Sequence, residues 1–103
     1  MLTVIAQYKT MHDKGGEVAA TLAKHVAATR KEPGCREFVA YRSRSDGERF
    51  LLYEQYDDDK AFEAHRASPH FEQYVQGVVV PLLEERTFDI YDEVSAETSR
   101  VEL

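Results

Sequence analysis

Two histidines close together in the chain, His65 and His70, are the residues best suited to proton transfer. His65 follows Phe62 by three positions in a helical segment, so it should lean toward the buried side of that helix. His70 comes directly after Ser68-Pro69, at the start of a new helical turn whose N-terminus favours a neutral imidazole. A neutral imidazole beside an apolar cleft can abstract a proton at neutral pH. We therefore predict His65 as a base or hydrogen-bond acceptor, with His70 as its auxiliary.

Glu54 is a carboxylate within an otherwise apolar stretch of predicted strand. A buried carboxylate needs a partner or a raised pKa. It could orient a histidine, bind a substrate hydroxyl, or pair with an arginine across an interface between two chains. Buried ion pairs often serve packing and register, which favours a structural role, but Glu54 is also a catalytic candidate.

The histidine spacing argues against a metal site. Two histidines four positions apart on one helix would be a metal-binding signal, but here the spacing is five and Pro69 interrupts the helix. Further ligands would have to come from residues such as Glu54 or Asp58, so we predict no metal. The other two histidines, His12 in a polar loop and His25 in a helix, are expected to be exposed.

These residues must be positioned by a short series of strands and helices. Runs rich in β-branched and aromatic residues alternate with segments whose apolar residues recur at helical spacing. The resulting order, β-α-β-β-α-β with a split second helix, is the ferredoxin-like α+β pattern: a four-stranded antiparallel sheet with both helices on one face. The predicted strands are 2–9, 35–44, 49–56 and about 85–93. The predicted helices are 17–31, a second that is capped by 57–59 and runs to about 67, and a third that restarts at 68 and is stopped by Pro81. Residues 1–94 should form one domain, followed by a polar tail over 95–103.

Both faces of the sheet carry apolar residues. In the third strand Phe50, Leu52 and Tyr56 occupy one face, whereas Leu51 and Tyr53 occupy the other. One layer of helices covers one face, and exposing the second costs roughly 25 cal/mol per Å² of apolar area. We therefore expect a homodimer that pairs the open faces of two sheets into a dimeric α+β barrel.

The composition and charge of the chain argue against two classes of partner. The formal net charge is −6 and the cations are scattered, which argues against nucleic-acid binding. A single cysteine, Cys35, allows no intramolecular disulfide, and no run approaches the ~20 apolar residues of a membrane span. We expect a cytoplasmic protein with neither a nucleic-acid nor a membrane partner.

The region that holds these candidate residues resembles the antibiotic biosynthesis monooxygenase superfamily. The resemblance rests on 49–58, on Ala61 and Ala64-His65, on 68–71, and on a Glu-x-Gly-Cys turn at 32–35, and it covers about residues 1–93. It implies a ferredoxin-like dimeric α+β barrel with the substrate between the helices and the sheet. His65 and His70 would then line the substrate, with further contacts from Phe62, Phe71, Tyr74 and Arg66 on the helices and from Glu54 or Tyr53 on the sheet.

The resemblance also implies an activity. Members of this family include cofactor-independent monooxygenases of quinols and polycyclic phenols, haem degraders, and an isomerase of a phosphorylated sugar. The haem degraders of the family resemble one another in a set of Asn, Trp and His residues. This chain has neither asparagine nor tryptophan, which disfavours that branch. The Tyr-Glu-x-Tyr and His-x-x-x-Pro-His patterns look closest to the quinol-monooxygenase and isomerase branches.

We therefore expect a monooxygenase without a cofactor that oxidises a phenolic, quinol or polycyclic aromatic substrate with O₂. Two alternatives remain: an isomerase of a small sugar-like or phosphosugar-like metabolite, and a non-catalytic dimeric binding module. One fold hosts many chemistries, so the fold does not choose among them.

Overall fold

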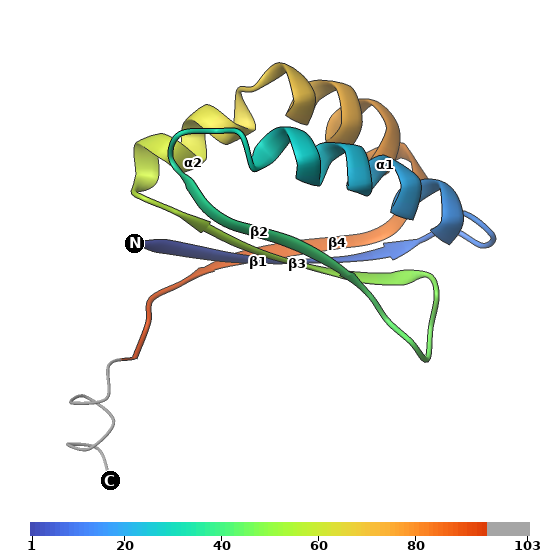
Figure 1. Ribbon diagram of the computed structural model, residues 1–103. Coiled ribbons are helices and arrows are strands. Elements are labelled where there is room, and N and C mark those ends of the chain that lie inside the picture. Colours follow the sequence, from blue (N-terminus) through green and yellow to red (C-terminus); the bar gives the residue numbers. More distant parts are fainter. Residues whose placement is uncertain (95–103) are drawn as a thin grey trace, which may run out of the picture.

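The computed structural model describes residues 1–94, which form one sheet covered by helices (Figure 1). The strands are β1 (Leu2–Thr10), β2 (Cys35–Arg42), β3 (Arg49–Tyr56) and β4 (Leu83–Tyr91). The helices are α1 (Gly15–Thr29), α2 (Asp59–Arg66), the π-helix η1 (Phe71–Val79) and the 3₁₀ turn η2 (Val80–Leu82).

The sheet is antiparallel throughout and has the order β2-β3-β1-β4. The helices α1, α2 and η1 lie in one layer on the same side of it (Figure 1). The predicted ferredoxin-like α+β fold is therefore confirmed. Its boundaries are close to those expected, and β3 begins and ends where the sequence predicted.

The core lies between the sheet and the helices. Alternate residues of each central strand point into it, as the period of a β-strand requires. Val4, Ala6 and Tyr8 of β1 are buried beside Phe50 and Leu52 of β3. From the helices, Val18, Leu22, Val75 and Val79 pack onto this surface.

The second helical segment departs from the expected geometry. The sequence predicted an α-helical stripe of Phe71, Tyr74, Val75 and Val78, but 71–79 is a π-helix whose buried residues are Phe71, Val75 and Val79. A π-helix closes its hydrogen bonds from i to i+5, so its turn is wider and residues four apart stay on one side. The predicted break at Ser68-Pro69 is present, and the Ser68 hydroxyl accepts the Phe71 N–H at 3.2 Å.

The open face of the sheet is apolar at its centre. The strand register places Val39, Tyr53 and Ile5 in one row and Tyr41 beside Leu51 in the next. Tyr41 is 55% exposed and Leu51 is 36% exposed. This is the surface through which the sequence predicts a dimer, and that remains a prediction.

No helix within residues 1–94 is long and apolar enough to cross a membrane. The predicted polar tail, 95–103, lies outside the described residues.

Candidate functional site

The turn between α1 and β2 meets α2 in a close contact. Asp57 donates its N–H to the carbonyl of Gly34 at 2.9 Å, and a Cβ built on Gly34 would lie 2.5 Å from the Cβ of Ala61. Asp58 caps α2 by accepting the N–H of Ala61 at 2.9 Å. These contacts hold the turn, and with it Glu32, against the helix that carries His65.

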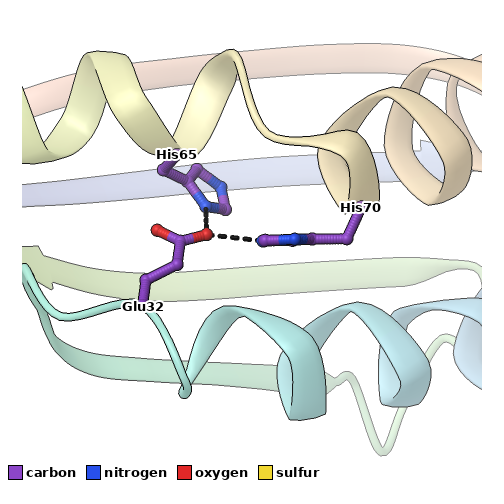
Figure 2. Close-up of side chains that lie close together, drawn as sticks. All are labelled: Glu32, His65 and His70. Atoms are coloured by element: carbon purple, nitrogen blue, oxygen red, sulfur yellow. Dashed lines mark hydrogen bonds and ion pairs between the residues drawn. The ribbon is translucent and has the colours of Figure 1, made fainter.

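Glu32, His65 and His70 converge on one carboxylate oxygen (Figure 2). Oε2 of Glu32 lies 2.9 Å from Nδ1 of His65 and 2.5 Å from Nε2 of His70. The His65 side chain is 2% exposed, whereas those of Glu32 and His70 are 16% and 19% exposed. The cluster is therefore closed on the His65 side and reachable from solvent on the other.

The hydrogen bond to Glu32 determines which ring nitrogen of His65 carries the proton. Burial lowers the pKa of His65, while the hydrogen bond and negative charge of Glu32 act in the opposite direction. A neutral imidazole carries one proton, so donation from Nδ1 to the carboxylate leaves Nε2 as a proton acceptor. The His65 ring also lines the adjacent cavity.

His25 is not exposed, contrary to the sequence prediction. It is 1% exposed, and its ring centroid lies 5.2 Å from that of His65 and 5.5 Å from that of His70. Burial, with the neighbouring imidazoles next, lowers the pKa of His25 to about 3, so the ring is neutral. The prediction was wrong because α1 turns this position toward η1 and the sheet, where Phe38 packs on the ring at 5.3 Å.

Glu54 faces the helices and is hydrogen-bonded within its own strand. Its Oε1 accepts the hydroxyl of Tyr56 at 2.6 Å. Burial raises the pKa of Glu54 to about 7, although the Tyr56 hydrogen bond acts against this shift. Burial and the neighbouring carboxylate raise the pKa of Tyr56 well above its ordinary value. Glu54 can therefore gain or lose a proton near neutral pH.

A small cavity lies between the helices and the sheet and is lined by both Glu54 and His65. Its volume is about 30 Å³, and burial raises the pKa of Tyr8 on its wall to about 12. The guanidinium of Arg66 lies 5.7 Å from the ring centre of Phe62 and 5.5 Å from that of Phe88. The cavity walls include Tyr8, Glu54, Phe62, His65, Arg66, Phe71, Arg86 and Phe88.

The structure brings together most of the residues singled out from the sequence. Glu54, Phe62, His65, Arg66 and Phe71 all line the cavity. The other three do not line it. His70 is hydrogen-bonded to Glu32, the ring centroid of Tyr74 lies 6.5 Å from that of His25, and Tyr53 is on the open face of the sheet.

Sequence reasoning missed Phe88 on the cavity wall and four further residues of this region. Glu32 stood in the Glu-x-Gly-Cys turn and could have been chosen there, because a carboxylate next to a tight turn can reach a neighbouring helix. Tyr8 and Arg86 are paired across β1 and β4, so they are found only once the register is known. His25 is the fourth.

The fold and the histidine–glutamate cluster define an α+β protein with a small aromatic-lined acid–base site. The family described as antibiotic biosynthesis monooxygenase matches residues 1–77, and the chain belongs to this family.

Three similar proteins illustrate the relationship. Over 73 residues the chain is 36% identical to "Putative monooxygenase Rv0793" of Mycobacterium tuberculosis, covering 71% of each chain. The solved structure of Rv0793 has a TM-score of 0.80 at 32% identity, over 91% of this chain and 98% of that one. A structure described as an antibiotic biosynthesis monooxygenase gives a TM-score of 0.85 at 27% identity, over 92% and 100%. The structure of PA3566 from Pseudomonas aeruginosa gives a TM-score of 0.84 at 29% identity, over 91% of this chain and 94% of that one.

Proposed function

We propose that this protein is a monooxygenase that oxidises a phenolic or quinol substrate with O₂ without a cofactor, and that His65 is its base. The observation that carries the proposal is the hydrogen bond of His65 Nδ1 to Glu32 in a ring that also lines the cavity. A base held by a carboxylate at one nitrogen presents the other to the substrate in a fixed orientation.

The cavity wall suits an aromatic substrate. Phe62, Phe71 and Phe88 provide apolar surface, and Tyr8 provides a hydroxyl that stays protonated because its pKa is about 12. Glu54, with a pKa of about 7, is a second group that can exchange a proton in the same space.

The reaction requires little more than deprotonation and shielding. His65 takes the hydroxyl proton, and the electron-rich phenolate passes electrons to O₂. One oxygen atom becomes a new carbonyl, the other leaves as water with the two hydrogens lost by the substrate, and the substrate supplies all four electrons. The enzyme contributes orientation of the phenolate and exclusion of bulk water.

The cavity has to widen before a ring can enter. At about 30 Å³ it has room for about one or two water molecules. Phe88 is 47% exposed. Its ring packs edge-on against Phe62, with 6.3 Å between centroids, and Arg66 makes a cation–π contact with each of the two rings. We infer that displacement of Arg66 and Phe88 opens the cavity.

Oxygen uptake by metal-stripped protein with a panel of quinols and polycyclic phenols tests the proposal. We expect turnover by at least one substrate class and a loss of ~10²-fold or more in His65→Ala. His12→Ala, which changes an exposed histidine, is the matched control and should retain full activity. Absence of turnover with every substrate, or loss of turnover on metal removal, would contradict the proposal.

One observation favours a second candidate, an isomerase of a phosphorylated sugar-like metabolite. Arg66 and Arg86 both line the cavity, and neither makes an ion pair with another residue of 1–94. Two unpaired guanidinium groups suit a phosphate. Protection of the folded state by inorganic phosphate in wild type but not in Arg86→Gln would favour this candidate over the monooxygenase.

A further inference from the structure

We propose that Glu32, His65 and His70 also form a binding site for one divalent transition metal ion, of which Zn²⁺ is the probe of choice. The inference goes beyond the proposed function, because it assigns a ligand to the cluster on the far side of His65 from the substrate cavity. It also revises the expectation from the sequence, which lacked a third ligand near the two histidines.

The three ligand atoms are already arranged for an ion. One nitrogen of each histidine and a Glu32 oxygen lie within 4.8 Å of one another. An ion about 2.1 Å from each of its ligand atoms holds neighbouring ligands about 3.0–3.4 Å apart. The His65 and His70 nitrogens lie 2.9 Å and 2.5 Å from Oε2 of Glu32. The first pair must therefore open by about 0.1–0.5 Å and the second by about 0.5–0.9 Å to admit the ion.

The chemistry of the set selects the class of ion. Imidazole is a borderline ligand and carboxylate a hard one; two imidazoles with a single carboxylate suit Zn²⁺, Fe²⁺ and their first-row neighbours and disfavour Ca²⁺ and Mg²⁺, which prefer all-oxygen ligand sets. Three protein ligands leave at least one coordination position for water. His70 and Glu32 are partly exposed, at 19% and 16%, so an ion has a route to the site from solvent.

A second observation points to a missing group at the same place. Among residues 1–94, Nδ1 of His25 is the buried side-chain nitrogen or oxygen atom that has no hydrogen-bond partner. Its ring lies beside both histidines of the cluster, at 5.2 and 5.5 Å between centroids. Unsatisfied buried polar atoms are uncommon in folded proteins, so an unpartnered imidazole nitrogen in the ring packed on both ligand histidines is consistent with a group missing from this cluster.

Metal binding has a consequence for His65. An ion at Nδ1 displaces the proton from that nitrogen, and a neutral imidazole then carries its proton on Nε2. Nε2 becomes a donor and can no longer accept a proton from a substrate. Bound Zn²⁺ should therefore inhibit any reaction that uses His65 as a base.

Titration of the metal-stripped full-length protein with Zn²⁺ by calorimetry, and with Co²⁺ by visible absorption, tests the site without any substrate. We expect one ion per chain, bound in the micromolar range or tighter. His70→Ala and Glu32→Gln should each weaken binding by ~100-fold or more, because loss of a direct ligand exceeds the 10–100-fold effect of outer contacts.

The chain offers a matched control. His12, Asp13 and Glu48 form a second group of potential ligands, but His12 and Asp13 are exposed, with side-chain exposures of 89% and 83%. His12→Ala should bind Zn²⁺ as wild type does. His70→Gln, which removes the ligand nitrogen with less loss of volume, replaces His70→Ala if the latter does not fold.

Three results would overturn the proposal: no Zn²⁺ binding by wild type, unchanged binding in a folded His70 variant, or loss of binding in His12→Ala. All of them leave the proposed monooxygenase activity untouched, because oxygen uptake is measured on metal-stripped protein. Inhibition of that uptake by Zn²⁺ in wild type, where turnover is present, would add independent support.

Discussion

Nδ1 of His65 lies 2.9 Å from Oε2 of Glu32, although 33 positions separate the two residues in the chain. The contact joins the turn after α1 to the last turn of α2, so it depends on how these two helices pack side by side on the sheet. It leaves one ring nitrogen of His65 to interact with the cavity. The first prediction follows from this relationship.

Glu32→Gln should lower kcat by roughly 10²-fold with a folded protein, because the neutral amide no longer stabilises the imidazolium that forms when His65 takes a proton. Loss of the negative charge also lowers the pKa of His65, since Glu32 acts to raise it. The acid limb of the kcat profile should therefore move to lower pH. Oxygen-uptake rates across pH measure both effects.

Glu63→Gln is the control for that experiment, because Glu63 is exposed on the same helix as His65. A positioning role for Glu32 is contradicted if its variant keeps both the wild-type rate and the wild-type pH profile.

Glu54→Gln tests the second acid–base group through stability. The pKa of Glu54 is raised from 4.5 to about 7 by burial, so between these values the unfolded chain loses its proton while the folded chain keeps it. Wild-type stability should consequently fall as pH rises from about 4.5 to about 7, by up to roughly 3 kcal/mol. The glutamine variant cannot ionise, so it should lack this fall and gain relative to wild type above pH ~7.

Urea denaturation of both proteins at several pH values between 4 and 8 measures the difference, as ~1.36 kcal/mol per unit of pKa shift. Parallel curves for wild type and variant across this range would show that the carboxyl of Glu54 titrates normally.

The fold was predictable from the sequence because its signals are local. The apolar and aromatic run at 49–56, the turn at 45–47 and the Ser68-Pro69 restart each act within a few residues. The same strand pattern separated Glu54 from Tyr53 but could not say which of them faces the helices. That choice is made by the whole sheet, which buries Glu54 and turns Tyr53 to the open face.

The site was only partly predictable because its contacts are long-range. His65 could be chosen from helical spacing, but Glu32 reaches it through the packing of Gly34 on Ala61. His25 was expected in solvent because a single histidine in a helix carries no sign of what covers it. The π-helical turn of 71–79 likewise has no simple pattern in the sequence.

The open face of the sheet provides a prediction about assembly. Leu51→Arg combined with Tyr53→Arg should convert a dimer into a monomer, because two charges would be buried at the centre of an apolar interface. Sedimentation velocity measures the change. Lys24→Glu, on the exposed side of α1, should leave the assembly intact. A wild-type protein that sediments as a monomer would refute the dimer.

Gly34 should tolerate no side chain, whereas Gly16 should. Neither glycine has a positive φ, so alanine fits both backbones and space decides the outcome. A Cβ on Gly34 would lie 2.5 Å from the Cβ of Ala61, while a Cβ on Gly16 would meet nothing within 4 Å. Gly34→Ala must push α2 away from the turn, which we expect to cost about 1–3 kcal/mol. Gly16→Ala, inside α1, should instead stabilise the protein by about 0.5–1 kcal/mol.

Urea denaturation of the two variants checks these opposite signs, and activity separates stability from the site. Because α2 carries His65 and the turn carries Glu32, a displacement at Gly34 should lengthen their hydrogen bond and lower kcat at temperatures where the variant is still folded. Gly16→Ala lies outside this contact and should keep the wild-type rate. Equal stability and equal rates in the two variants would mean that Gly34 and Ala61 are not in close contact in solution, and that Glu32 is held against His65 by some other part of the fold.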